Sequence, residues 1–64
     1  MTQKELLYLE DAIGHEDNII SIINESLNYL EDERLITFMN SELDRHNSIK
    51  ENLMDLLEDK VNEW

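Results

Sequence analysis

Cysteine, proline and glycine are nearly missing from this 64-residue chain, which has no cysteine, no proline and the single glycine Gly14. Without cysteine there can be no disulfide framework, the usual support of small secreted domains. β-Sandwiches and barrels depend on proline and glycine in their turns, so the composition argues against both classes. The length allows one small domain, residues 1–64, whose thin core needs support from a metal or from a partner subunit.

Basic residues are scarce as well, because five Lys and Arg stand against 16 Asp and Glu and give a net charge of −11. Proteins that bind the phosphate backbone of nucleic acids need clustered basic side chains, so we expect no direct nucleic-acid binding. An anionic membrane surface would repel this chain, and no apolar run approaches the roughly 20 residues of a membrane span. Residues 1–5 contain no apolar stretch of a secretory signal, so the expected location is the cytoplasm.

In the first half of the chain, apolar residues recur at alternating steps of three and four, which predicts an amphipathic helix. This series consists of Leu6, Leu9, Ile13, Ile20, Ile23, Leu27 and Leu30. Thr2 and Glu5 form a capping-box pattern, so the first helix is expected at about residues 3–30. Gly14 falls inside it, where a close helix approach, a π-bulge or chance would each account for a glycine.

The second half of the chain predicts another helix, at about residues 33–63, with Asp32 as its N-cap after a turn at about residues 31–33. The main apolar series is Leu35, Met39, Ile49, Leu53 and Leu56, flanked by Ile36, Leu43 and Leu57. Because the turn is too short to do more than reverse the chain, the predicted fold is an all-α, antiparallel two-helix hairpin. Tyr29 and Phe38 are expected to meet at its turn end.

Both apolar stripes are wider than the contact between two helices requires. A single hairpin would leave one flank of each stripe in water and forfeit about 25 cal/mol for each Å² left exposed. Two hairpins packed face to face would bury both flanks in a four-helix bundle. We therefore expect a homodimer or a higher even oligomer.

Polar residues interrupt both stripes near their centres: Glu16 in the first, and Glu42 and His46 in the second. In a hairpin that turns near residue 32, Glu16 lies across from the region of His46. A buried carboxylate is costly unless it is paired, and a Glu16–His46 pair would satisfy it and could set the helix register. Two copies of these carboxylates and imidazoles would also suit iron or zinc, so Glu16, Glu42 and His46 are candidate metal ligands. Lys50, at the edge of the stripe, is expected to pair with an acid or to extend toward water.

The segments LEDAIGHE at residues 9–16 and ELDRH at residues 42–46 resemble half of a ferritin-like, rubrerythrin-type bundle, and are similar to the short coat-F-like proteins of spore-forming Firmicutes. In that superfamily a glutamate and an E-x-x-H motif on the next helix bind two irons between paired halves. The resemblance matches Glu16 to the glutamate and His46 to the histidine. The motif's own glutamate falls on Leu43, one residue after Glu42, so the resemblance implies a degenerate site kept for assembly, with the spore as a second location.

Catalytic patterns are otherwise missing from the sequence, which has no cysteine nucleophile and no glycine-rich phosphate loop. The predicted function is therefore a non-enzymatic, structural self-association module that forms an acidic four-helix bundle without a cofactor. One alternative is a ferritin-like bundle that binds iron or zinc at a degenerate site. Another is an acidic mimic of nucleic acid, which would inhibit a basic protein partner through its carboxylate-rich faces.

Overall fold

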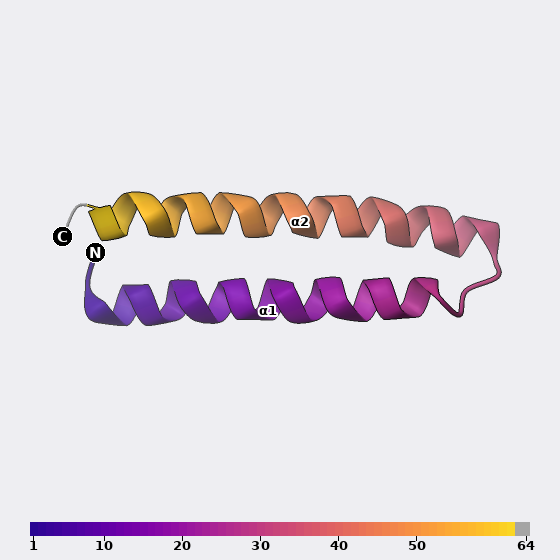
Figure 1. The fold of residues 1–64 in the computed structure, drawn as a ribbon, viewed down its shortest axis with the longest axis horizontal. Helices are drawn as coiled ribbons and strands as arrows, with labels where there is room; N and C mark the ends of the chain where they lie inside the picture. Colours follow the sequence, from indigo (N-terminus) through magenta and orange to yellow (C-terminus); the bar gives the residue numbers. More distant parts are fainter. Residues whose placement is uncertain (63–64) are drawn as a thin grey trace.

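The computed structural model describes the backbone of residues 1–62 and the side chains of residues 1–59. The chain forms two helices, α1 (Gln3–Leu27) and α2 (Glu33–Asn62), and the described residues contain no strand. The helices lie side by side and antiparallel, so the start of α1 and the end of α2 lie at the same end of the molecule (Figure 1). The hairpin measures 48 × 15 × 12 Å. The predicted all-α helical hairpin is confirmed. Neither helix, over its described residues, is long and apolar enough to cross a membrane.

Side-chain caps start both helices where the sequence predicts them. The Thr2 hydroxyl accepts a hydrogen bond from the backbone N–H of Glu5 at 3.1 Å, and the Glu5 carboxylate accepts one from the backbone N–H of Thr2 at 2.9 Å. Asp32 accepts hydrogen bonds from the backbone N–H groups of Arg34 and Leu35, at 2.9 and 3.1 Å. These bonds satisfy N–H groups that have no partner inside the helix.

The first helix ends three residues before its predicted end, at Leu27 rather than near residue 30, so the connection covers residues 28–32 rather than 31–33. Backbone N–H groups of Asn28 and Tyr29 bond to carbonyl groups three residues back, at 3.1 and 3.0 Å, which tightens the last turn. The sequence predicted too long a first helix because Leu30 continues the apolar series. Leu30 belongs to the turn and is nevertheless half-buried, so a residue at this position does not need to be helical to be covered. The predicted end of the second helix near residue 63 lies outside the described residues.

One continuous seam joins the helices and follows a seven-residue pattern on both. On α1 it consists of Leu6, Leu9, Ile13, Glu16, Ile20, Ile23 and Leu27, continued by Leu30 in the turn. On α2 it consists of Ile36, Met39, Leu43, His46, Lys50, Leu53 and Leu57. All of these residues are half-buried or buried. Among the described hydrophobic residues, only Leu9 and Ile23 are buried, so a single hairpin has a thin core.

The seam of α2 corrects the prediction of which apolar residues face α1. Leu35 and Leu56, assigned above to the main stripe, are 49% and 46% exposed. Ile36, Leu43 and Leu57, assigned to its flank, are half-buried in the seam. The apolar surface of α2 is wider than one seam. The side that packs against α1 is the one that also carries His46 and Lys50. The expectation that a lone hairpin leaves one flank of each stripe exposed is confirmed on α2 only, since Ala12 and Ile19, which widen the stripe of α1, are half-buried.

Gly14 is an ordinary helical position in the hairpin, since α1 continues through it as an α-helix and a Cβ atom added there would meet nothing within 4 Å. Replacing Gly14 by alanine is therefore expected to raise the free energy of unfolding by about 0.5–1 kcal/mol, the difference in helix propensity. Chemical denaturation monitored by circular dichroism measures this change. An unchanged or lower stability would show that another chain or a helix bend needs the glycine.

Candidate functional site

Three polar side chains form a layer at the middle of the seam, which we call the central layer: Glu16, Glu42 and His46. Nδ1 of His46 lies 2.5 Å from Oε2 of Glu16 on the other helix, and Nε2 of His46 lies 3.4 Å from Oε2 of Glu42, one turn away on α2. All three side chains are partly buried. The predicted pairing of Glu16 with His46 across the hairpin is confirmed, because residue 16 and residue 46 both occupy seam positions at the same level.

The imidazole of His46 has a carboxylate at each ring nitrogen, which decides what the central layer can do. A neutral imidazole has one N–H donor and one acceptor nitrogen, and only the protonated ring can donate to both carboxylates. A metal ligated by His46 would have to replace one of these contacts. Among the described residues, no group of three or more His, Cys, Asp or Glu side chains is arranged to hold a metal ion. Metal binding by Glu16, Glu42 and His46 stays a prediction.

Arg45 extends the central layer toward solvent. Its Nη1 atom lies 3.4 Å from Oε2 of Glu42, but the arginine side chain is 66% exposed. An ion pair in water contributes at most about 1 kcal/mol, so this contact adds little to the stability of the hairpin. Glu42 thus has a cationic partner on each side, Arg45 toward solvent and, when its ring is protonated, His46 toward the seam.

The seam is widened on one side only. Among residues 1–59, whose side chains the structure describes, those half-buried outside the seam are Ala12, Ile19, Ser26, Glu42 and Ile49. All five fall at one heptad position, directly before the first seam position of each repeat. In antiparallel helix pairs these positions of both helices flank the same side of the seam. Across the seam, the flanking positions are exposed and mostly polar: Glu10, Asp17, Asn24, Asn40, Asn47 and Met54.

Exposed apolar side chains lie on the widened side toward both ends of the hairpin, with the exposed polar residues His15, Arg45 and Asn52 between them, and we call this surface the open face. Its members are Tyr8 and Ile22 on α1, and Leu35, Phe38 and Leu56 on α2. Intervals of seven residues return side chains to nearly the same side of a helix, with a drift of about 20° per interval. Tyr8 and Leu56 also line one shallow hollow of about 550 Å³ together with Met1, Glu5 and Leu9, so the two helices contribute to one surface.

Two smaller predictions concern Lys50 at the edge of the seam and the aromatic residues near the turn. Lys50 pairs with an acid as expected, its Nζ atom 2.5 Å from Oδ1 of Asp17 on the other helix. The expected contact between Tyr29 and Phe38 at the turn stays a prediction, and both side chains are exposed. The turn of residues 28–32 leaves Tyr29 outside the seam, and Phe38 lies on the open face.

Sequence reasoning found the central layer but missed the orientation of Leu35 and Leu56. The sequence holds no signal that decides this orientation, because the series that starts at Leu35 and the series that starts at Ile36 both continue along the helix at alternating steps of three and four residues. Each series has five apolar and two polar positions, Glu42 and His46 being the polar ones in the first and His46 and Lys50 in the second. Apolar content alone therefore does not choose between the two series.

No protein-family model matches this chain, and neither a curated protein nor a solved structure matches it significantly. The resemblance to ferritin-like bundles therefore stays a prediction from residues 9–16 and 42–46.

Proposed function

We propose that this protein is a non-enzymatic self-association module, in which two hairpins pack through their open faces into an acidic four-helix bundle. The observation that carries the proposal is the open face itself: Ile22, Leu35, Phe38 and Leu56 are large apolar side chains exposed on one side of a hairpin with few buried residues. An exposed apolar surface of this extent marks an interaction site in soluble proteins.

The exposed surface area of the hairpin and the area of its broad face are both consistent with a dimer. The chain of 7.7 kDa exposes 5104 Å², against the roughly 4,300 Å² expected of a compact monomer of this mass. One broad face of the hairpin, 48 Å long and 15 Å wide, covers about 700 Å² as a rectangle. Two copies would then bury about 1,400 Å² in total, within the roughly 1,200–2,000 Å² of stable interfaces.

The distribution of charge favours a second copy as the occupant of the open face. The exposed acidic residues that lie on the other sides of the helices are Glu10, Asp11, Asp17, Glu25, Asp44, Glu51, Asp55 and Glu58. Two open faces would therefore meet with most of the net charge of −11 pointing outward. The remaining repulsion between the copies is screened by salt, so dimerisation should strengthen as ionic strength rises.

The central layer supports a role in choosing the partner. Glu42 and Arg45 lie beside the seam on the open face, so two packed copies would bring their polar groups to one level near the middle of the bundle. A carboxylate or arginine placed against leucine would be left without a partner, which penalises any shifted alignment. The central layer then sets the alignment of the two hairpins.

A metal-binding bundle is the second candidate, supported by the contact of Glu16, Glu42 and His46. Because both ring nitrogens of His46 already have carboxylate partners, we expect added zinc or ferrous iron to leave the thermal midpoint unchanged. Elemental analysis of purified protein, with thermal unfolding at increasing metal concentration, measures this. A stoichiometric metal content that is lost in a His46→Gln variant would instead establish the metal site.

Sedimentation equilibrium over a range of protein concentrations and salt concentrations tests the self-association proposal. We expect a species of twice the chain mass, or an even multiple, whose dissociation constant falls as salt is added. A folded monomer at micromolar concentration, at every salt concentration, would overturn the proposal.

A further inference from the structure

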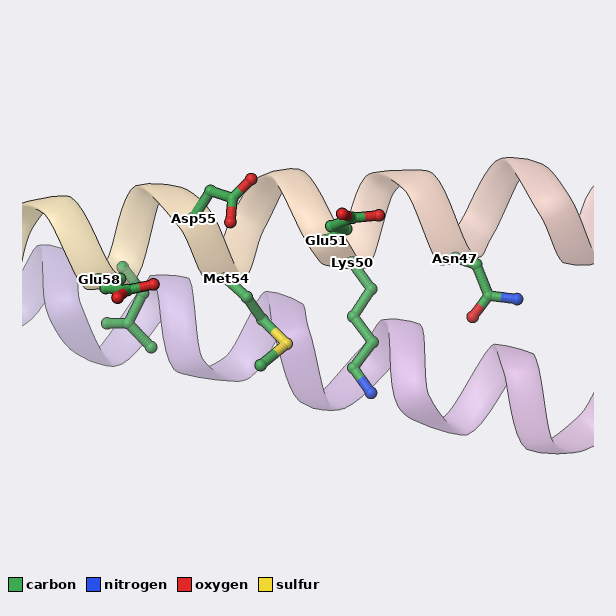
Figure 2. A pocket seen from close by; sticks show the side chains of 7 residues that line it. Asn47, Lys50, Glu51, Met54, Asp55 and Glu58 are labelled. Carbon is green, nitrogen blue, oxygen red and sulfur yellow. The ribbon is translucent and has the colours of Figure 1, made fainter.

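A second apolar surface lies across the seam from the open face, in the C-terminal half of α2. It is a shallow groove of about 560 Å³. Its lining residues are Asn47, Lys50, Glu51, Met54, Asp55, Leu57 and Glu58. The side chains of Lys50 and Met54 extend from α2 toward α1, whereas Asp55 points away from α1 (Figure 2). We call this surface the acidic groove.

The floor of the acidic groove is apolar and adaptable. Met54 is 49% exposed, although it is a large apolar side chain, and Leu57 lies beside it in the seam. The methylene chain of Lys50 adds apolar surface, while its ammonium group contacts Asp17 on α1. Methionine is flexible and polarisable, and it is common at surfaces that accept varied apolar side chains.

The rim of the acidic groove carries a single sign of charge. Glu51, Asp55 and Glu58 are spaced by four and three residues, so they lie along one side of α2, and all three are exposed. Lys50, the cation in the groove, is already paired with Asp17. A ligand that fits this groove therefore has to bring both apolar side chains and positive charge.

We propose that the acidic groove binds a basic amphipathic helix of a partner protein, one with apolar side chains on one face and Lys or Arg beside them. Residues 47–58 span about 16 Å of helix, the length of about three turns of a bound helix. An amphipathic helix that places its apolar face in a groove is an established mode of protein recognition, and the carboxylates of the rim select for a basic one.

Binding in the acidic groove does not require dimerisation. The groove lies on the side of the seam occupied by Asp17 and Met54, whereas the open face lies on the side of Ile49 and Leu56. A dimer formed through the open faces would leave both grooves accessible. The bundle would then hold two basic helices, one on each outer side.

Fluorescence anisotropy with a labelled synthetic peptide tests the proposal. The probe is a peptide of about 16 residues, roughly 24 Å as a helix, with leucine at every third or fourth position and lysine and alanine elsewhere. A second probe with the same lysines has serine in place of leucine. We expect saturable binding of the leucine peptide at moderate ionic strength and at least tenfold weaker binding of the serine peptide, which has no apolar face.

Two charge-matched variants locate the binding surface. Glu51→Gln/Asp55→Asn/Glu58→Gln removes three carboxylates from the rim and should weaken binding of the leucine peptide about tenfold. Asp11→Asn/Glu25→Gln/Glu31→Gln removes three exposed carboxylates elsewhere and should change it less than about twofold. Met54→Ser should weaken it about fivefold through the lost apolar contact. Circular dichroism verifies that each variant stays helical.

Equal binding of the two peptides, or equal weakening by the two triple variants, would overturn the proposal, since binding would then be general attraction to an acidic protein. Absence of binding would overturn it as well. The Leu35→Glu variant separates this result from the dimer, because its substitution is on the open face near the turn. It should bind the leucine peptide as the wild type does even if it is monomeric.

Discussion

Replacing Leu35 by glutamate is expected to convert the proposed dimer into monomers, with a dissociation constant at least about 100-fold higher. Leu35 is 49% exposed in one hairpin and would be buried between two. Each copy then loses about 1–2 kcal/mol of apolar burial, and each places a carboxylate in a desolvated interface, which costs more. Sedimentation equilibrium of wild type and variant measures the shift.

The variant leaves the hairpin itself intact for a reason that the structure provides. Leu35 lies in the first turn of α2, next to the Asp32 cap, and a negative charge there interacts favourably with the helix N-terminus. Loss of the dimer would therefore not reflect a weakened helix. Any loss of helix content that depends on protein concentration would itself report dissociation, because in the proposed dimer the second copy covers the thin core of each hairpin.

Leu7→Glu is the matched control. Leu7 is also near the start of its helix and is 56% exposed, and the substitution adds the same charge. Leu7 falls one position after a seam residue, on the side away from the open face. We expect its dissociation constant to stay within about threefold of the wild-type value. Equal effects of the two variants would mean that charge alone, and not the open face, governs association.

Replacing both Glu16 and His46 by leucine is expected to make the protein more stable and to leave its assembly unchanged. A buried or partly buried ion pair exchanged for packed apolar residues is often neutral or stabilising by about 1–4 kcal/mol. Because Glu42 and Arg45 remain on the open face and Lys50 remains in the seam, the double variant should form the same assembly as the wild type. Chemical denaturation measures the stability of the double variant, and sedimentation equilibrium measures its assembly.

The single substitutions should behave in the opposite way. His46→Leu leaves the partly buried carboxylate of Glu16 without its partner at 2.5 Å and is expected to cost about 1–3 kcal/mol. A double-mutant cycle over Glu16 and His46 then gives a coupling energy that neither single variant shows. Arg45→Ala breaks an exposed pair with Glu42 and should change stability by less than about 1 kcal/mol.

Two results would contradict the roles proposed for the polar residues at the centre of the hairpin. A Glu42→Leu/Arg45→Leu variant that forms the same single dimer as the wild type would show that these polar residues do not select the alignment. A His46→Leu variant of unchanged stability would show that the contact with Glu16 carries no energy. Either result leaves the Leu35→Glu test of the open face unaffected, because Leu35 is about three turns away from His46 along α2.

Local chemistry allowed the sequence to predict much of the hairpin. The capping residues Thr2, Glu5 and Asp32 act through side-chain bonds to N–H groups two or three residues away, so their pattern predicts the starts of both helices without any tertiary contact. The antiparallel arrangement follows from the short connection. The pairing of Glu16 with His46 follows in turn, because a hairpin with a known turn places opposite residues by counting.

The sequence alone determined that this protein is two antiparallel helices with a polar layer at the centre of an apolar stripe. Only the tertiary structure decided which part of the second stripe the seam buries, and so left Leu35, Leu56 and Met54 exposed. The physical reason is that a stripe wider than one seam can face its neighbour at several rotations of nearly equal apolar content. The packing of α1 against the series from Ile36 to Leu57 selects one rotation, and that choice creates both the open face and the acidic groove.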